Sequence, residues 1–423
     1  MKIAIVHDYL REYGGAERVV EALHEIWPEA PLYTSFVDWK ALGSQAYRFR
    51  DWDIRTSPIA DNWFIRKFHS PLRFLAPAIW RSLDLSGYDV VLTSSGWFMC
   101  RGIKAGHGLG RLSGYASFAH PSGPNSIAPS AVSVKGSDGV QNRAPRRALL
   151  NANQGPLHIC YIHHPPRNLY GYATGSTLQK YWPVRIYATI INFFLRHYDF
   201  ETAQKVDYFI ANSQETARRV EKFYRRESTV IYPPVEVIRD TKHVTRKNVS
   251  HVTHHMSQGY YLSVGRLTYS KRVDLAIGTA NRLKLPLKIV GTGSEESYLR
   301  SSAGPTVDFL GSVSDDELAA LYRGAKALIF CALDEDFGMV PLEAEAAGVP
   351  VIALSQGGIL ETVINGKTGV LFGEPTIEAL TDAIYRFINL PINQSDCVKQ
   401  AQRFSKIHFR QSMTKFVNAV LPK

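Results

Sequence analysis

The sequence lacks the long apolar runs of a membrane-spanning or secreted protein. No stretch of about 18 uncharged apolar residues occurs in its 423 residues, so we expect no membrane-spanning helix. The opening MKIAIVHDY has a short apolar run closed by His7 and Asp8, which indicates a strand and not the apolar part of a secretory signal. We therefore expect a cytoplasmic protein.

Cysteine is scarce and scattered. No CxxC pair occurs, which argues against a disulfide framework and against a cysteine zinc site; the four residues are Cys100, Cys160, Cys331 and Cys397. Four histidines lie between residues 243 and 255, in a polar stretch with no helix or hairpin pattern to fix their geometry. We assign no metal ligands.

The fingerprint G-x-G-x-x-G is also missing, which argues against a dinucleotide-dependent dehydrogenase. The chain does have an excess of positive charge, formally +11, which favours anionic partners such as nucleotides, lipid surfaces, diphosphate carriers or nucleic acid. Because the basic residues are dispersed and no nucleic-acid-binding motif occurs, we do not expect nucleic acid as the partner.

Two series of short apolar segments, rich in β-branched residues, alternate with helical stretches. The first series runs from Lys2–His7 to Thr229–Tyr232 and the second from Tyr260–Val264 to Val349–Leu354. Continuous apolar strands separated by helices are typical of parallel sheets that are covered on both faces. The sequence therefore predicts an α/β fold with two doubly wound, Rossmann-like domains facing each other across a cleft.

The boundary between the two series lies at Tyr232-Pro233-Pro234, where two prolines stiffen an extended chain and an aperiodic polar stretch follows. We assign residues 1–235 to the N-terminal domain and residues 236–398 to the C-terminal domain. Residues 107–155 are rich in Gly, Ser, Pro and Ala without a sustained apolar period, which predicts a mobile insertion in the first domain.

The most specific motif is EDFGMVPLE, which runs from Glu335 to Glu343 and leads into a helical pattern. Because Pro341 suits a first helical turn, the amides of residues 338–340 should lie at a helix N-terminus, where free N–H groups and the helix dipole favour a diphosphate. Glu343, about one turn into the helix, can accept hydrogen bonds from a ribose diol. Taken alone, each glutamate is better explained as a surface or helix-capping carboxylate.

Three further segments carry candidate residues at strand ends, where open α/β sheets bind ligands. Arg266 and Lys271 follow the strand Tyr260–Val264 and can hold a departing diphosphate, although Lys271-Arg272 also fits a solvated helix start. Gly14-Gly15 allows a phosphate to approach the backbone, while an ordinary tight turn is the more frequent explanation. His163 can hydrogen-bond a sugar hydroxyl or the reacting centre, although a single histidine is more often structural.

Together, the segments GGAERVV, HHPPR, GRLTYSK, EDFGMVPLEAEAAGVPVIA and GGILETVINGKTG resemble glycosyltransferase family 4, the retaining enzymes of the GT-B fold, and especially its bacterial mannosyltransferase-like branch. The resemblance covers nearly the whole chain apart from the two insertions. It implies that the N-terminal domain takes the acceptor, that the C-terminal domain binds the nucleotide-sugar donor, and that residues 399–423 form a helix crossing back to the N-terminal domain.

The resemblance also implies roles for individual residues. Glu343 would hold the donor ribose, Arg266 and Lys271 the diphosphate, and Glu335 the hydroxyls of the donor sugar. His163 matches the active-site histidine. The remaining donor-binding residues would be Gly14, Gly15, Phe337, Gly338, Met339, Val340 and, beside the base, Val313, while Arg167 would contact the acceptor.

The implied reaction moves a hexosyl group, with mannosyl from GDP-mannose as first choice, to a hydroxyl of a glycan or lipid-linked acceptor in cell-surface polysaccharide synthesis. The anomeric configuration is retained. Since no carboxylate can be assigned as covalent nucleophile, we expect same-face attack with the leaving diphosphate as base, and neither a cofactor nor a metal. Two alternatives stay open: a nucleotide-sugar epimerase of the same architecture, and a non-catalytic nucleotide-sugar-binding protein.

Two apolar segments bear on location. Residues 62–81, NWFIRKFHSPLRFLAPAIWR, interleave aromatic and basic side chains, which fits both an anionic membrane surface at the inner face of the cell membrane and a core-facing helix pair with a basic outer side. Residues 181–194 are apolar but too few to span a bilayer and include Arg185, so we expect a buried helix there.

Overall fold

The computed structural model describes residues 1–105, 155–173, 181–235 and 259–421. The predicted insertion lies almost entirely outside the described residues, and so do the polar stretch after Val235 and the four histidines between residues 243 and 255.

The first lobe is built on a seven-stranded sheet in the order β3-β2-β1-β4-β5-β6-β7. All neighbouring strands are parallel, so the carboxyl ends of β1, β4 and β5 meet at one edge. The strands are β1 (Ile3–His7), β2 (Leu32–Thr34), β3 (Ile54–Thr56), β4 (Val90–Ser95), β5 (Leu157–Ile162), β6 (Tyr208–Ala211) and β7 (Ser228–Val230).

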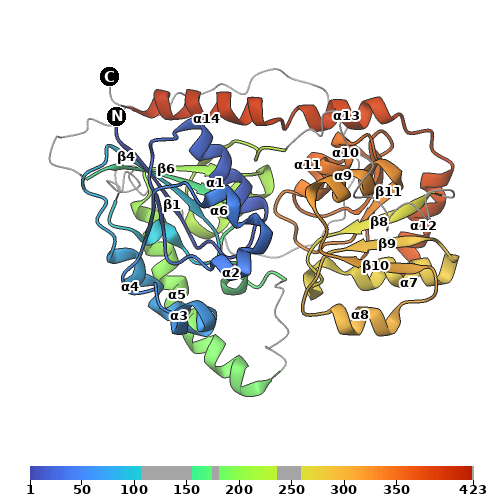
Figure 1. The fold of residues 1–423 in the computed structure, drawn as a ribbon, viewed down its shortest axis with the longest axis horizontal. Coiled ribbons are helices and arrows are strands. Elements are labelled where there is room, and N and C mark those ends of the chain that lie inside the picture. The colour runs from blue at the N-terminus through green and yellow to red at the C-terminus, as the bar shows by residue number, and fades with distance from the viewer. Residues whose placement is uncertain (106–154, 174–180, 236–258, 422–423) are drawn as a thin grey trace, which may run out of the picture.

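Helices cover both faces of this sheet (Figure 1). They are α1 (Gly15–Ile26), α2 (Trp39–Leu42), α3 (Trp63–Phe68), α4 (Ala76–Arg81), α5 (Trp182–Lys205) and α6 (Gln214–Tyr224), with a 3₁₀ turn, η2 (Pro71–Leu75), between α3 and α4. Gly14 caps the N-terminus of α1, with its N–H donating to the Glu17 carboxylate at 2.9 Å, and the helix buries Val19, Val20 and Leu23 on one face.

The second lobe repeats the plan with a six-stranded parallel sheet in the order β10-β9-β8-β11-β12-β13. Its strands are β8 (Tyr260–Val264), β9 (Leu287–Val290), β10 (Val307–Gly311), β11 (Ala325–Phe330), β12 (Val351–Leu354) and β13 (Gly369–Phe372). Its helices are α7 (Val273–Leu283), α8 (Glu296–Ser302), α9 (Asp315–Gly324), α10 (Met339–Ala346), α11 (Ile359–Thr362) and α12 (Ile377–Ile388). The predicted fold class of two doubly wound parallel α/β domains is confirmed.

Two connections join the lobes. Helix α13 (Gln394–Gln402) packs on α10 of the second lobe, and α14 (Lys406–Val420) continues along the top of Figure 1 to the first lobe. There Phe409, Met413 and Val417 are buried in the same core cluster as β1 and α1. The segment that leaves the first lobe and the segment that returns to it are in contact, because the Val235 N–H donates to the Phe404 carbonyl at 2.8 Å.

Residues 181–194 do not form a buried helix, so that prediction is wrong. They begin α5, which has 24 residues and is therefore about 36 Å long, longer than the strands that it covers. Its second half packs on the lobe through Leu195 and Tyr198, while its first half runs out at the bottom of Figure 1. The apolar composition of residues 181–194 did not indicate that this helix extends beyond the sheet.

Candidate active site between the lobes

The two glycines after β1 lie directly against the start of α10 in the other lobe. A Cβ atom built on Gly15 would lie only 2.8 Å from the sulfur of Met339. Met339 is the first residue of α10, and Gly338 before it has a φ of +97°, a conformation that glycine adopts without strain. The predicted phosphate-facing loop of lobe one and the predicted diphosphate loop of lobe two therefore meet.

Glu343 lies one turn into α10 and is buried at the same interface. Its carboxylate accepts hydrogen bonds from Arg18 of lobe one and, at 3.2 Å, from the hydroxyl of Tyr322 in its own lobe. Burial, and next the charge of Glu343, hold the pKa of Tyr322 well above its ordinary value, so this hydroxyl keeps its proton and donates. Neither partner was expected from the sequence.

Lys271 and Arg266, the two cations predicted to bind the diphosphate, both form ion pairs at this interface. The Lys271 ammonium donates to the Glu335 carboxylate at 2.6 Å, which brings together two residues that are 64 positions apart. The Arg266 side chain is largely exposed and reaches across to Glu12, in the loop after β1, at 3.0 Å. Both cations thus lie beside carboxylates at the lobe interface.

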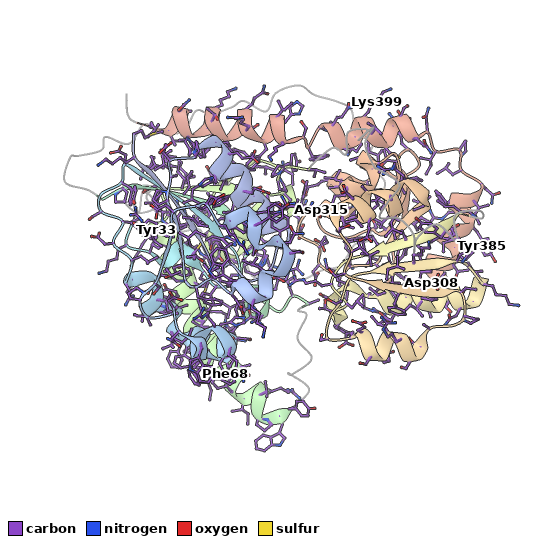
Figure 2. All side chains as sticks on the ribbon, viewed as in Figure 1. Tyr33, Phe68, Asp308, Asp315, Tyr385 and Lys399 are labelled. Atoms are coloured by element: carbon purple, nitrogen blue, oxygen red, sulfur yellow. The ribbon has the colours of Figure 1, made fainter. Side chains whose placement is uncertain are left out.

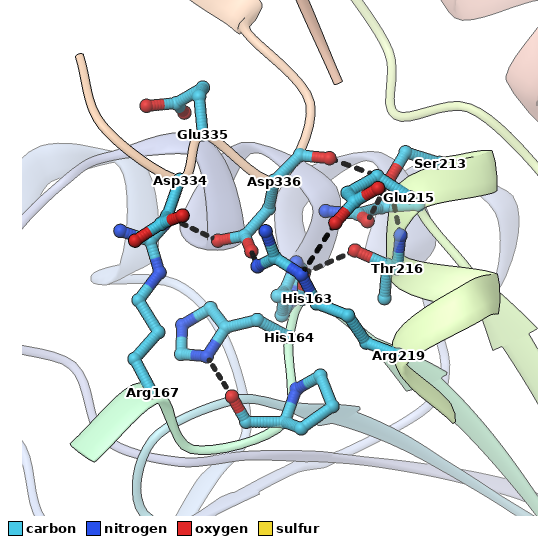
Figure 3. Close-up of polar contacts among 12 residues, drawn as sticks. His163, His164, Arg167, Ser213, Glu215, Thr216, Arg219, Asp334, Glu335 and Asp336 are labelled. Carbon is cyan, nitrogen blue, oxygen red and sulfur yellow. Dashed lines mark hydrogen bonds and ion pairs between the residues drawn. The ribbon is translucent and has the colours of Figure 1, made fainter. Parts of the chain in front are cut away.

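Asp336, which is not among the predicted site residues, ties the lobes together (Figure 3). Its carboxylate accepts hydrogen bonds from Arg167 and from Arg219, each at 2.5 Å, and its backbone carbonyl accepts one from Ser213 at 2.6 Å. Burial alone would raise the pKa of Asp336, but the charges of Arg167, His164 and Arg219 lower it below the ordinary value. The sequence feature that could have identified Asp336 as a site residue is its position inside the motif EDFGMVPLE.

His163 directly follows β5 and stands at one end of a series of buried polar side chains. Its Nε2 lies 2.7 Å from the Ser94 hydroxyl, which lies 3.1 Å from Nδ1 of His7, and Nε2 of His7 lies 3.3 Å from Glu17. Glu17 also accepts the N–H of Gly14. These successive contacts link His163, the predicted active-site histidine, to the loop that contains Gly14 and Gly15.

The pKa values of the two histidines in this series, His163 and His7, are shifted in opposite directions. Burial, and next the neighbouring charges of His7 and His164, lower the pKa of His163 well below its ordinary value, so its ring is neutral at neutral pH. Burial also opposes charge on His7, but hydrogen bonding to Glu17 and the charge of Glu17 outweigh it and raise the pKa of His7.

Residues 245–404, which include all of the second lobe's sheet, match the family model described as Glycosyl transferases group 1. The match spans the second lobe, which we call the group 1 domain after the matching model.

Curated relatives match this chain over part of their length. A glycogen synthase from Mycobacterium tuberculosis is 36% identical over 140 residues, which cover 31% of this chain and 34% of the relative. The human alpha-1,3/1,6-mannosyltransferase ALG2 is 27% identical over 252 residues, which cover 52% of this chain and 60% of the relative. The match to the first of these relatives thus spans about a third of that protein.

Solved structures match both lobes. The Anabaena protein HepE in complex with UDP and glucose has a TM-score of 0.64 at 16% identity and covers 99% of each chain. The apo form of the lipopolysaccharide outer core galactosyltransferase WaaB has a TM-score of 0.60 at 15% identity over 100% of both chains. At this identity the likeness shows the fold, which is the GT-B fold.

The remaining predicted residues lie in and around the group 1 domain with differing exposure. The side chain of Phe337 is buried and packs on Tyr232 and Phe404 where the two connections meet, so any part it takes in donor binding comes from its backbone. Val340 and Val313 are half-buried against the core of the domain. Arg167, the predicted acceptor residue, is engaged by Asp336 in this structure.

Two kinds of feature are missing from the described residues. No group of three or more His, Cys, Asp or Glu residues among them is arranged to hold a metal ion. None of the helices in these parts of the chain is both long and apolar enough to cross a membrane.

Proposed function

We propose that this protein is a retaining glycosyltransferase that moves a hexosyl group from a nucleoside-diphosphate sugar to a hydroxyl of a glycan or lipid-linked acceptor. The proposal rests on the observation that candidate residues from both lobes come together at the interface between the lobes. Glu343, Glu335 and Lys271 of the group 1 domain lie opposite the Gly14-Gly15 loop and Arg18 of lobe one.

The proposed division of labour follows from the chemistry of each group. The buried Glu343 carboxylate accepts hydrogen bonds from the donor ribose, and Glu335 accepts them from hydroxyls of the donor sugar. Arg266, Lys271 and the free amides at the start of α10 stabilise the charge that develops on the leaving diphosphate. In a closed cleft such preorganised donors contribute about 3 kcal/mol each to lowering the barrier.

His163 completes the proposed site from lobe one. Its neutral ring and its carbonyl stand at the carboxyl end of β5, which is separated only by β4 from β1 and the glycine loop that follows it. In the proposed reaction, the bond from the anomeric carbon to the diphosphate breaks, the acceptor oxygen attacks from the same face, and its proton passes to the diphosphate. With two cations and the helix amides on that diphosphate, no metal or cofactor is required in this proposal.

For the donor we propose GDP-mannose, with cell-surface polysaccharide synthesis as the setting. The mannosyltransferase relatives support the sugar, whereas a solved neighbour of the same fold was crystallised with UDP and glucose, so base and sugar need a direct comparison. For the location we propose the inner face of the cell membrane, where lipid-linked acceptors are found.

The decisive experiment incubates the purified protein with GDP-mannose, UDP-glucose, UDP-galactose and UDP-N-acetylglucosamine, with and without a membrane extract as acceptor source. We expect transfer of mannose to the extract and release of GDP, and loss of both in Lys271→Ala. Interconversion of the donor sugar in the absence of extract would show an epimerase instead. Saturable nucleotide-sugar binding without turnover of any donor would show a binding protein.

A further inference from the structure

The first half of α5 carries an apolar surface that the lobe leaves uncovered. Trp182 is 71% exposed and Phe193 is 64% exposed, with Ile186 and Ile190 between them more than half exposed. At 3.6 residues per turn these four positions share one face of the helix. Single exposed apolar residues are ordinary, but a continuous row of this size marks an interaction site.

A second helix extends the same surface. Trp63 and Phe64 of α3 are 67% and 50% exposed, and Figure 2 shows Phe68 among the side chains that stand out there above the free end of α5. Helix α5 is held to η2, the turn that follows α3, because Tyr187 of α5 donates to the Pro71 carbonyl and Arg73 of η2 donates to Asn192 of α5. We call the exposed side chains Trp182, Ile186, Ile190, Phe193, Trp63 and Phe64 the aromatic ridge.

Helix α5 has three sides with different surroundings. Leu195 and Tyr198 pack on the lobe, the aromatic ridge faces away from it, and Arg185 and Arg196 are exposed on the third side. An apolar row bordered by arginine is the pattern of a helix that lies in a membrane interface, with its rings at the depth of the lipid headgroups.

Charge identifies the occupant of this surface. Residues 62–81 and 181–197 contain six Arg or Lys and no Asp or Glu. A second copy of the chain would bring the same positive charge to the contact. Residues 106–154 of this chain hold five Arg or Lys and one Asp, so they would be repelled as well.

We propose that the aromatic ridge inserts into the interface of an anionic lipid bilayer while the flanking lysine and arginine side chains contact its headgroups. The assignment gives a surface to the proposed membrane location and does not rest on the sugar chemistry. It also explains why the first half of α5 is apolar on two sides although only one of them is packed.

The test measures binding to vesicles of phosphatidylglycerol and phosphatidylcholine, and to vesicles of phosphatidylcholine alone, by co-sedimentation. We expect the wild type to bind the mixed vesicles, with weaker binding at high salt. The double variant Trp182→Ser with Phe193→Ser should lower the vesicle partition coefficient by about 10-fold or more, since it removes two large apolar side chains from the contact. Both side chains are exposed, so circular dichroism should be unchanged.

The matched control is Tyr298→Ser with Ile388→Ser, two side chains that are each 60% exposed on the second lobe. It should bind vesicles as the wild type does. Lys67→Gln with Arg185→Gln should reduce the preference for phosphatidylglycerol, whereas Lys367→Gln with Lys399→Gln on the other lobe should not.

Three results would overturn the proposal: no binding of the wild type to anionic vesicles, equal losses in the ridge variant and its control, or a ridge variant that binds like the wild type. A dimer that the ridge substitutions dissociate, with vesicle binding unchanged, would assign the surface to a second copy. Vesicle binding without sugar transfer from any donor would leave this assignment standing and remove the proposed function instead.

Discussion

Glu343 already has two hydrogen-bond donors around its carboxylate, Arg18 and Tyr322, which come from different lobes. Under the proposed function, a ribose diol would take a similar place as donor. This contact exists with or without a sugar on the nucleotide. We therefore expect Glu343→Ala to weaken binding of the free nucleoside diphosphate by about 10- to 100-fold, the usual range for a hydrogen bond to a charged group. Isothermal titration calorimetry with GDP measures it.

Glu335→Ala is the matched comparison, since this carboxylate is paired with Lys271 and its proposed partners are sugar hydroxyls. Its binding of free GDP should stay near that of the wild type, while turnover of the complete donor falls by about 100-fold or more. Unchanged GDP affinity in Glu343→Ala would remove the ribose assignment, and equal losses of GDP binding in both variants would remove the distinction between the two roles.

At this scale the sequence indicated individual candidate residues better than it indicated their partners. Glu335, Glu343 and Lys271 could be found because a strand end, a helix start and their charges all lie within short segments. Ser94 could not be found in the same way, and Asp336 was not predicted although it lies inside the motif Glu335–Glu343. Their partners Arg167, Arg219 and His163 come from other strands and helices, and only the folded chain brings them together.

Among the elements, α10 combines the proposed donor site on one side with a buried acid on the other. Glu345 is fully buried where α10 packs on α13, and burial raises its pKa from 4.5 to about 8, an effect that the nearby Thr368 hydroxyl only partly offsets. The folded protein therefore binds a proton that the unfolded chain releases above about pH 4.5. Stability conferred by the neutral acid is fully present below that pH and is lost as the pH rises to about 8.

We predict that the free energy of unfolding falls by about 4 kcal/mol between pH 4.5 and pH 8 through this residue, because each tenfold difference in proton affinity between the folded and unfolded chains corresponds to about 1.4 kcal/mol. Glu345→Gln should remove most of that dependence and raise stability at pH 8. Denaturant unfolding at several pH values measures it, with the exposed Glu374→Gln as control. A pH dependence unchanged by Glu345→Gln would show that Glu345 is ionised in the folded protein.

The strands show which elements a sequence specifies. Buried strands such as β1 and β8 were predicted from their apolar runs, Lys2–His7 and Tyr260–Val264. The short β2, β3 and β13, with three or four residues each, were not predicted, whereas β7, which is as short and lies at a sheet edge, was predicted as Thr229–Tyr232. The exposed half of α5 was misjudged because apolar residues that face a partner look the same in sequence as residues that face a core.

For the whole molecule, several charged pairs join the two lobes. Asp336 with Arg167 and Arg219, Glu343 with Arg18, and Glu12 with Arg266 all join one lobe to the other. Charged pairs of this kind can exchange one partner for another without loss of a packed core. A nucleotide that bridges both lobes would therefore tighten an arrangement that the free protein holds more loosely.

We predict a smaller radius of gyration in small-angle scattering when GDP is bound than when it is absent. Asp336→Asn, which keeps the shape of the side chain and removes the charge that attracts two arginines, should enlarge the radius of the free protein. Arg266→Ala should abolish the GDP-dependent change at moderate GDP concentration. If saturating GDP leaves the curve unchanged while turnover is normal, the lobes are already assembled in the free protein.

The return of α14 to the first lobe also fixes an order of events during synthesis. Phe409, Met413 and Val417 belong to the core of the first lobe, yet the ribosome makes them only after every strand of the second. The lobe that is translated first is thus the last to be completed. Until α14 is made, part of the apolar core of the first lobe stays uncovered in the nascent chain. A chain that ends after residue 405 would therefore have an intact second lobe and an incomplete first lobe.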